Sequence, residues 1–382
     1  MNIGFGCIWL KDRKRTRSHT AYSLFKSLQE LNDANVYDLD ASLKGSELFF
    51  HKLSNMIVHK GKLKSKYTFS RRYLKSLERN LLHERKKFKD IDAIIEIADI
   101  GVIPKIPFYL YQDLSIDVII KHFEKYHHPV PGWEIFNLND LYKRKEWQMR
   151  IYDQCSGIFA ESQWLADSLI KDTGISPEKV YALERGINIR PVLACHPYHR
   201  KSKQEKTIFF IGRDFFRKGG PLVVEAFKLL RKNYSKNVKL IIAGPKSWPL
   251  PGRFPEGVQY IGDAPWDVIQ QYFKETDVFC MPSYFEGGYP IIFLESLCFG
   301  IPCIGRNIQG MSEIIKPGVN GYLLNSDSID KLAELMIKTI EDDRMKSEVE
   351  RMSKSYQDYY SWDRVASDMI KIIESNQNKI SG

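Results

Sequence analysis

Short apolar runs alternate with amphipathic stretches along most of this chain. In the C-terminal half the apolar runs are rich in β-branched and aromatic residues, and segments with helical spacing separate them. The predicted strands are 207–212, 238–244, 258–262, 277–282 and 301–305, and the predicted helices are 221–232, 265–274 and 290–299. This alternation is typical of βαβ units around a buried parallel sheet, whose ligands bind beyond the carboxyl ends of the strands.

The N-terminal half follows the same pattern less regularly. Its predicted strands are 2–8, 35–38, 92–97, 107–111, 156–160 and 179–183, and its predicted helices lie near 19–31, 139–154 and 162–172. The segment 185–206 is polar, basic and contains prolines, so we place a linker there. The sequence therefore predicts an α/β protein with two doubly wound, Rossmann-like domains that face a central cleft.

Composition agrees with two globular domains. A chain of 382 residues with 43% hydrophobic residues is too long for one ordinary core. The six cysteines form no Cys-x-x-Cys pair, which argues against a zinc site and against a disulfide framework; they are Cys7, Cys155, Cys195, Cys280, Cys298 and Cys303. The N-terminus resembles a buried strand and not a signal peptide, and no stretch reaches the roughly 20 apolar residues of a membrane span. We expect a cytoplasmic protein.

Positive charge is concentrated in one segment. Residues 60–89 contain 12 lysines and arginines against two glutamates, which accounts for the whole formal charge of +10. Leu74, Leu77 and Leu81 in this segment are spaced for one face of a helix. Two interpretations remain open, namely docking on an anionic membrane at its cytoplasmic face and a core-packed helix with a solvated basic face. Nucleic acid is not an expected partner, because no recognition motif accompanies the cations.

A candidate anion site follows the first strand of the C-terminal half. Arg213 comes directly after the strand, and Lys218 precedes Gly219, Gly220 and a helix that opens with Pro221. Bidentate arginine contacts, a lysine charge and the backbone N–H groups of a helix N-terminus together suit a diphosphate. The alternative is a basic loop that is merely solvated.

The segment PSYFEGGYPIIFLESLCFGIPCIG contains two candidate glutamates. Its glycines, Gly287 and Gly288, allow backbone amides to approach a ligand closely, and Pro290 suits the first position of a helix. Glu295 is the only charge in an apolar run, where the hydroxyls of a ribose or an internal salt bridge would satisfy it. Glu286 faces the predicted cleft, or is simply an exposed acid in a turn.

These motifs together resemble one family. The series GR…KG, VQYIG, DVFCMPS, EGG…LES and IPCIG is similar to the retaining GT-B glycosyltransferases, known as glycosyl transferases group 1 or family four, closely over 205–325. Weaker similarities are 158–188, 318–324 and 361–373. The resemblance implies a GT-B fold with an acceptor-binding domain at 1–190, a donor-binding domain at 191–360 and a last helix, 361–382, that packs back on the N-terminal domain.

The resemblance also implies an activity and residue roles. It implies transfer of a hexose-type sugar from a UDP- or GDP-linked donor to a glycan, a lipid-linked molecule or a protein, with retention assisted by the leaving phosphate. The implied catalytic residues are Arg213, Lys218, Glu286 and Asp113. The implied donor-binding residues are Gly212, Arg213, Lys218, Ile261, Gly287, Gly288, Tyr289, Pro290 and Glu295. No cofactor and no metal ion are expected, because two side-chain cations can replace a metal at the diphosphate. The loop EGGYPIIFLE is one residue longer than the family pattern, so the resemblance fixes Glu295 but not the register of Glu286.

Possible sugar or acceptor contacts lie in the N-terminal half. Where the family commonly has His followed by Asp at a strand end, FYLYQDLS has Gln112 and Asp113. Asp113 would contact sugar or acceptor, or cap the next helix. His19, between the first strand and first helix, and Gly6 are further candidates, and a surface or capping role suits His19 equally well. A sugar-nucleotide epimerase or phosphorylase on the same fold is the alternative enzyme class, although it would need additional acid and base groups near the donor.

Overall fold

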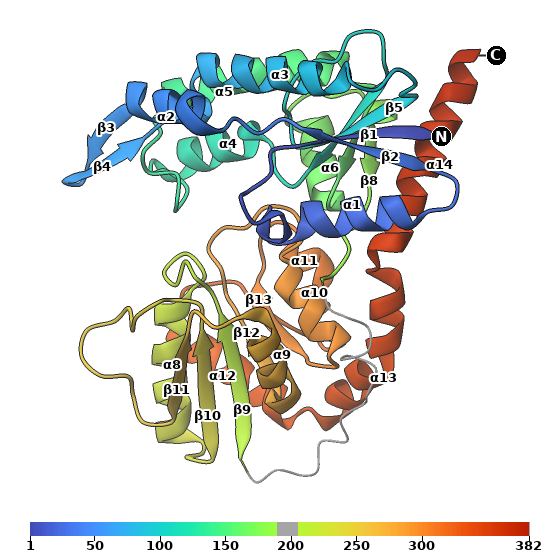
Figure 1. Cartoon of the computed structure of the whole chain (residues 1–382). Coiled ribbons are helices and arrows are strands. Elements are labelled where there is room, and N and C mark those ends of the chain that lie inside the picture. Colours follow the sequence, from blue (N-terminus) through green and yellow to red (C-terminus); the bar gives the residue numbers. More distant parts are fainter. Residues whose placement is uncertain (189–204, 382) are drawn as a thin grey trace. The chain divides into compact units, whose positions relative to one another are not determined.

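The computed structural model describes residues 1–188 and 205–381, which divide into two compact units (Figure 1). The N-terminal unit comprises Met1–Asn188 and Ser361–Gly382, and the C-terminal unit comprises Ile189–Tyr360. Most of the predicted linker 185–206, with Cys195, lies outside the described residues. Among the described residues, no helix has both the length and the apolar character that a bilayer span requires.

A six-stranded parallel sheet forms the centre of the N-terminal unit, in the order β2-β1-β5-β6-β7-β8. The strands are β1 (Asn2–Cys7), β2 (Asn35–Asp40), β5 (Ala93–Ile97), β6 (Phe108–Gln112), β7 (Gly157–Ala160) and β8 (Val180–Ala182). The helices are α1 (Thr20–Glu30), α2 (Gly45–Ser54), α3 (Arg71–Arg85), α4 (Ile116–Tyr126), α5 (Leu138–Gln154), α6 (Gln163–Lys171) and α14 (Trp362–Ser381). Three short 3-10 turns, Arg13–Arg15, Tyr67–Phe69 and Pro177–Lys179, complete the unit with an antiparallel hairpin of β3 (Met56–His59) and β4 (Lys62–Ser65).

Helices cover both faces of this sheet. Side chains of α3, α5 and α6 form the core on one face, and side chains of α1 and α14 form it on the other. On α14, Val365, Met369 and Ile373 are buried at helical spacing against the same cluster as Leu24 and Leu28 of α1. The C-terminal helix is therefore an integral part of the N-terminal unit (Figure 1).

The leucines of the basic segment belong to this core. Leu74, Leu77 and Leu81 of α3 are at most 5% exposed, so the helix is core-packed with a solvated basic face. Our alternative that these leucines face lipid is wrong, because they pack against the sheet and α5. The hairpin was not predicted from the sequence. Lys60 and Gly61 form its two-residue turn and both have positive φ, so the glycine was the available sequence signal.

The C-terminal unit contains a second six-stranded parallel sheet, in the order β11-β10-β9-β12-β13-β14. Its strands are β9 (Lys206–Ile211), β10 (Val238–Ala243), β11 (Val258–Gly262), β12 (Val278–Cys280), β13 (Cys303–Arg306) and β14 (Gly321–Leu324). Its helices are α8 (Gly220–Asn233), α9 (Trp266–Glu275), α10 (Ile291–Cys298), α11 (Met311–Ile314), α12 (Ile329–Glu341) and α13 (Asp343–Tyr359). Numbered along the chain, this order is the Rossmann order 3-2-1-4-5-6, which reverses direction between β9 and β12.

Aromatic rings fill the core on one side of this second sheet. Phe209 of β9 and Phe279 of β12 pack edge to face with each other, Phe209 also packs against Phe273 of α9, and Phe279 against Phe293 of α10. Helices α8 and α12 pack together, and α13 packs against α10. The rigid sheet therefore fixes where the loops after β9 and β12 emerge.

Candidate functional site

Two loops meet at the point where the strand order of the C-terminal sheet reverses. The first follows β9 and leads into α8, and the second follows β12 and leads into α10. The backbone N–H of Tyr284 in the second loop donates to the carbonyl of Arg217 in the first, at 2.8 Å. Gly219 of the first loop has φ +81° and lies against Pro282 of the second loop, where an added Cβ would stand 2.6 Å from the Pro282 carbonyl oxygen. In open α/β sheets this crevice is where ligands bind.

A buried ionic cluster joins the two loops. The Oε1 atom of Glu286 lies 2.6 Å from Lys218 Nζ, 2.9 Å from Arg217 Nη1 and 2.6 Å from Ser283 Oγ. Arg217 also donates to the carbonyl of Phe285. The side chains of Lys218 and Glu286 are only 16% and 10% exposed. Glu286 is thus not the exposed turn acid of our alternative, and Lys218 does not belong to a merely solvated loop.

The charge state of Glu286 follows from these contacts. Burial alone would raise the pKa of its carboxyl group, but Lys218 and Arg217 outweigh burial and hold that pKa below its ordinary value. The carboxylate is therefore ionised at neutral pH. Arg217 has a second partner, because its Nε lies 2.9 Å from Asp214, whose side chain is 44% exposed. Lys218 therefore depends on the buried Glu286 for its charge balance, whereas Arg217 is shared between Glu286 and the more exposed Asp214.

Arg213 occupies a different environment. Its side chain is 66% exposed and pairs at 3.1 Å with Asp263, which directly follows β11. The amides of Lys218, Gly219 and Gly220 donate to carbonyls of Asp214, Phe216 and Phe215 in the same loop. The prediction that backbone amides before α8 are available to an anion is wrong for these three residues, because the turn uses them itself.

The second loop presents other amides. Within the described part of the chain, nothing accepts a hydrogen bond from the amides of Gly287 and Gly288, whereas the amide of Glu286 is bound by the Gln309 side chain at 2.7 Å. Pro290 is the residue before α10 and not its first helical residue.

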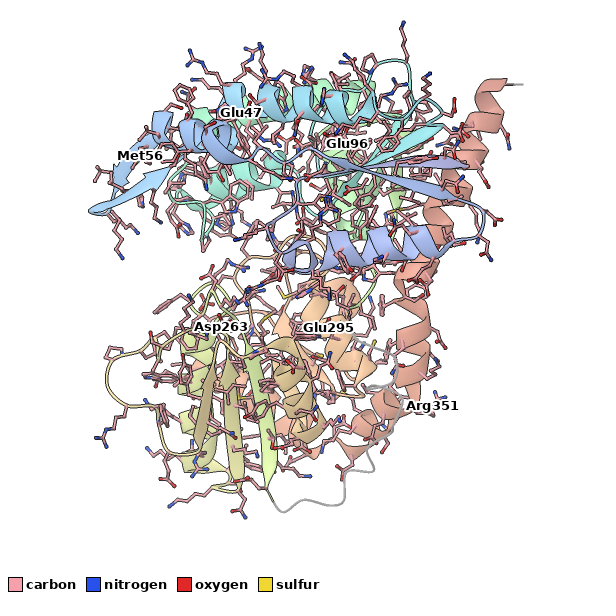
Figure 2. All side chains as sticks on the ribbon, viewed as in Figure 1. Glu47, Met56, Glu96, Asp263, Glu295 and Arg351 are labelled. Atoms are coloured by element: carbon pink, nitrogen blue, oxygen red, sulfur yellow. The ribbon has the colours of Figure 1, made fainter. Side chains whose placement is uncertain are left out.

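The remaining predicted donor residues lie around these loops. Glu295 is on α10 and 2% exposed, Tyr289 is 6% exposed, and Ile261 is half-buried on β11. Gly212 directly follows β9 and has no room for a side chain beside Lys218. Figure 2 shows Asp263 and Glu295 toward the same end of the C-terminal unit.

Residues 196–357 match the family model of glycosyl transferases group 1. The C-terminal unit is a group 1 domain. A curated relative is the D-inositol 3-phosphate glycosyltransferase of Paenarthrobacter aurescens, which is 23% identical over 259 residues, or 63% of this chain and 62% of the relative. The matches span about half the length of the first curated relatives.

Solved structures share the whole fold. The sucrose-phosphate synthase of Thermosynechococcus elongatus superposes with a TM-score of 0.67 at 13% identity, over 100% of both chains. The Anabaena protein HepE, solved in complex with UDP-glucose, superposes with a TM-score of 0.63 at 14% identity, over 98% of this chain and 100% of its own. The predicted GT-B fold, with its two Rossmann-like domains, is thereby confirmed.

Outside the group 1 domain, the predicted residues of the N-terminal unit lie near the carboxyl ends of its strands. Asp113, after β6, pairs with Arg17 at 3.3 Å. It does not cap α4, because the capping position belongs to Ser115. Gln112 is 1% exposed. His19 is the half-buried residue before α1, with φ +74° and no side-chain capping bond.

Gly6 lies inside β1, where an added Cβ would meet Leu81 at 3.2 Å and Glu96 at 3.3 Å. Its small size therefore serves packing within the N-terminal unit.

Several charged residues near the strand ends were not among the predicted site residues. Arg217 directly precedes Lys218 in the sequence, and this pair of adjacent cations could have indicated that Arg217 belongs to the same anion site. In the N-terminal unit, Glu161 directly follows β7 and pairs at 3.1 Å with Arg185, which also donates to Thr20. Burial raises the pKa of Glu161 to about 7, against the opposing effect of Arg185.

We expect Glu286→Gln to lower the free energy of unfolding of the group 1 domain by about 2–4 kcal/mol at pH 7, because it removes the carboxylate that pairs with Lys218 and one of the two that pair with Arg217. The folded-state pKa of Glu286 is depressed. Its contribution is therefore complete above the unfolded-state pKa of about 4.3 and is lost as pH falls through the folded-state pKa. Urea unfolding at pH 7, 5 and 3.5 should show a difference from wild type that shrinks at the lowest pH. Glu225→Gln, on the exposed surface of α8, is the control, and an unchanged difference at all three pH values would contradict the assignment.

Proposed function

We propose that this chain is a retaining glycosyltransferase that moves a hexose-type sugar from a UDP- or GDP-sugar to a glycan, a lipid-linked molecule or a protein. The observation that carries the proposal is the junction of the two loops at the reversal of the C-terminal sheet. It brings the side chains of Lys218 and Arg217 and the amides of Gly287 and Gly288 to one place. The match to glycosyl transferases group 1 spans this junction.

The donor diphosphate would bind beside Lys218 and Arg217. Without a donor, Glu286 serves as their shared counterion, and the half-exposed Asp214 pairs with Arg217 as well. A diphosphate could replace Asp214 as the partner of Arg217 and add to the contacts of Lys218. Arg213 is exposed at the same sheet edge and can turn from Asp263 to a phosphate. The nucleotide-sugar class is supported by the UDP-glucose in the solved structure of HepE.

In the proposed reaction the bond between the sugar and the diphosphate breaks, and the acceptor oxygen attacks from the same face. The leaving phosphate takes the acceptor proton, so no protein nucleophile is required. Lys218, Arg217 and Arg213 stabilise the charge that develops on the phosphate, which is the role that we assign to them in place of a metal ion. The amides of Gly287 and Gly288 would hold hydroxyls of the transferred sugar.

The experiment is incubation of the full chain with a panel of UDP- and GDP-sugars, with water as the acceptor. We expect release of nucleoside diphosphate from one class of donor, unaffected by EDTA, and a sugar product whose anomeric configuration, followed by NMR, initially matches that of the donor. No binding to any donor would contradict the proposal. An epimerised donor, or sugar phosphate formed only with inorganic phosphate, would instead support the epimerase or phosphorylase alternative.

A further inference from the structure

Helix α2 and the hairpin of β3 and β4 lie at the end of the N-terminal unit that is far from α14 (Figure 1). Six large apolar side chains within residues 49–63 are between 42% and 74% exposed. We call them the hairpin patch: Phe49, Phe50, Leu53, Met56, Val58 and Leu63. Contiguous exposed apolar groups of this size mark an interaction surface, whereas scattered ones do not.

The hairpin geometry gathers these side chains. Val58 of β3 and Leu63 of β4 are direct cross-strand partners, so both project from the same face of the hairpin. Phe49, Phe50 and Leu53 lie on α2, whose only buried residue is His51. Met56, labelled in Figure 2, begins β3 directly after α2. One helix and one hairpin therefore display the patch toward solvent.

The rim of the hairpin patch is basic. Lys60, Lys62 and Lys64 are exposed and make no ion pair with any residue that the structure describes. Arg71, Arg72 and Lys75 add exposed cations on the adjoining helix α3. No Asp or Glu occurs between positions 48 and 77. Two acids lie close by: Glu47 on α2 pairs with Arg79, and the charge of Glu134 interacts with Lys60 and Lys64. Cations still outnumber acids around the patch, and an apolar centre with a predominantly cationic rim complements a surface that offers both acyl chains and negative charge.

We propose that the hairpin patch docks this protein on the surface of an anionic lipid bilayer, independently of the proposed transfer reaction. The patch enters the boundary between headgroups and acyl chains, and Lys60, Lys62 and Lys64 lie among the lipid phosphates. A second copy fits less well, because a symmetric contact would bring the lysines of both copies together. Nucleic acid would neutralise the lysines but leave Leu53, Met56 and Val58 exposed.

The test is flotation of the full chain with vesicles of phosphatidylcholine alone and with about one third phosphatidylglycerol, at 0.15 M and 1 M salt. We expect binding to the anionic vesicles and at least tenfold weaker binding to the neutral ones. Each lysine near an anionic membrane surface raises the binding affinity roughly fivefold. Replacing all three with Lys60→Gln, Lys62→Gln and Lys64→Gln should therefore weaken vesicle binding about 10²-fold at 0.15 M salt and little at 1 M salt. Phe49→Ser with Phe50→Ser should weaken binding at least about tenfold at both salt concentrations.

Matched variants of the C-terminal unit serve as controls. Phe254→Ser with Val319→Ser removes apolar side chains that are 49% and 54% exposed, and Lys228→Gln with Lys331→Gln and Lys354→Gln removes three exposed lysines. Both controls should bind as wild type does, and all variants should keep wild-type donor hydrolysis, which separates this proposal from the proposed function. The proposal would be overturned if the protein bound neutral and anionic vesicles equally, or if the patch variants bound as wild type does. It would also be overturned by a lipid-free dimer, or by a nucleic-acid complex, that Phe49→Ser with Phe50→Ser abolishes.

Discussion

Replacing Lys218 with methionine should lower the rate of donor hydrolysis by about 10²–10³-fold, the effect typical of removing one preorganised charge from a developing anion. Lys218 is the most buried cation at the loop junction, so its interaction with a phosphate is poorly screened by water. Methionine fills similar space, and Arg217 remains to balance Glu286 at 2.9 Å. We therefore expect the variant to fold, as circular dichroism and thermal unfolding would verify.

The matched control is Lys228→Met. This residue lies on α8, the helix that follows Lys218, but it is about half exposed and pairs with Glu225. It should retain the wild-type rate. A rate for Lys218→Met close to that of the control, in a folded protein, would remove Lys218 from the catalytic set.

Glu295→Gln should weaken binding of the nucleoside diphosphate by about 10–100-fold, as measured by calorimetry. The carboxylate is buried on α10, the helix that follows the second loop. A carboxylate accepts hydrogen bonds from both hydroxyls of a ribose, whereas an amide has only one accepting oxygen, and bonds to charged groups are worth about 1.5–3 kcal/mol. Glu225→Gln is again the control.

The 2′,3′-dideoxynucleoside diphosphate makes this prediction specific. It lacks the hydroxyls that Glu295 is expected to hold, so wild type and Glu295→Gln should bind it with equal affinity. If Glu295→Gln lowers the affinity for the dideoxy compound by the same factor as it lowers the affinity for the natural nucleotide, Glu295 acts on something other than the ribose.

Periodicity predicted the strands and most helices that position the site because these elements are buried on a regular repeat. The apolar runs at 207–212 and 258–262 became β9 and β11 almost residue for residue. The predicted helix 290–299 became α10, Ile291–Cys298, and Gly300 lies two residues past its end with φ +72°. Such signals are local, and tertiary contacts reinforce them.

Contacts between distant residues could not be predicted in this way. Arg217 and Glu286 are 69 positions apart, and only the strand order brings their loops together. In the segment 60–89, too, the local pattern does not reveal which distant residues it contacts. Leucines at helical spacing indicate an apolar face, but whether that face contacts a sheet or lipid depends on what packs against it. Here Leu74, Leu77 and Leu81 face the sheet, and the exposed apolar groups come from α2 and the hairpin that precede them.

The place of α14 in the N-terminal unit constrains the order of folding during synthesis. A ribosome makes Val365, Met369 and Ile373 long after it makes Phe5 and Leu24, yet all five residues belong to one core. Until residues 362–373 emerge, one face of the N-terminal sheet remains partly uncovered while the intervening C-terminal unit is translated. The nascent chain therefore exposes a hydrophobic surface through most of its synthesis, which is the stage at which chaperones protect proteins from aggregation.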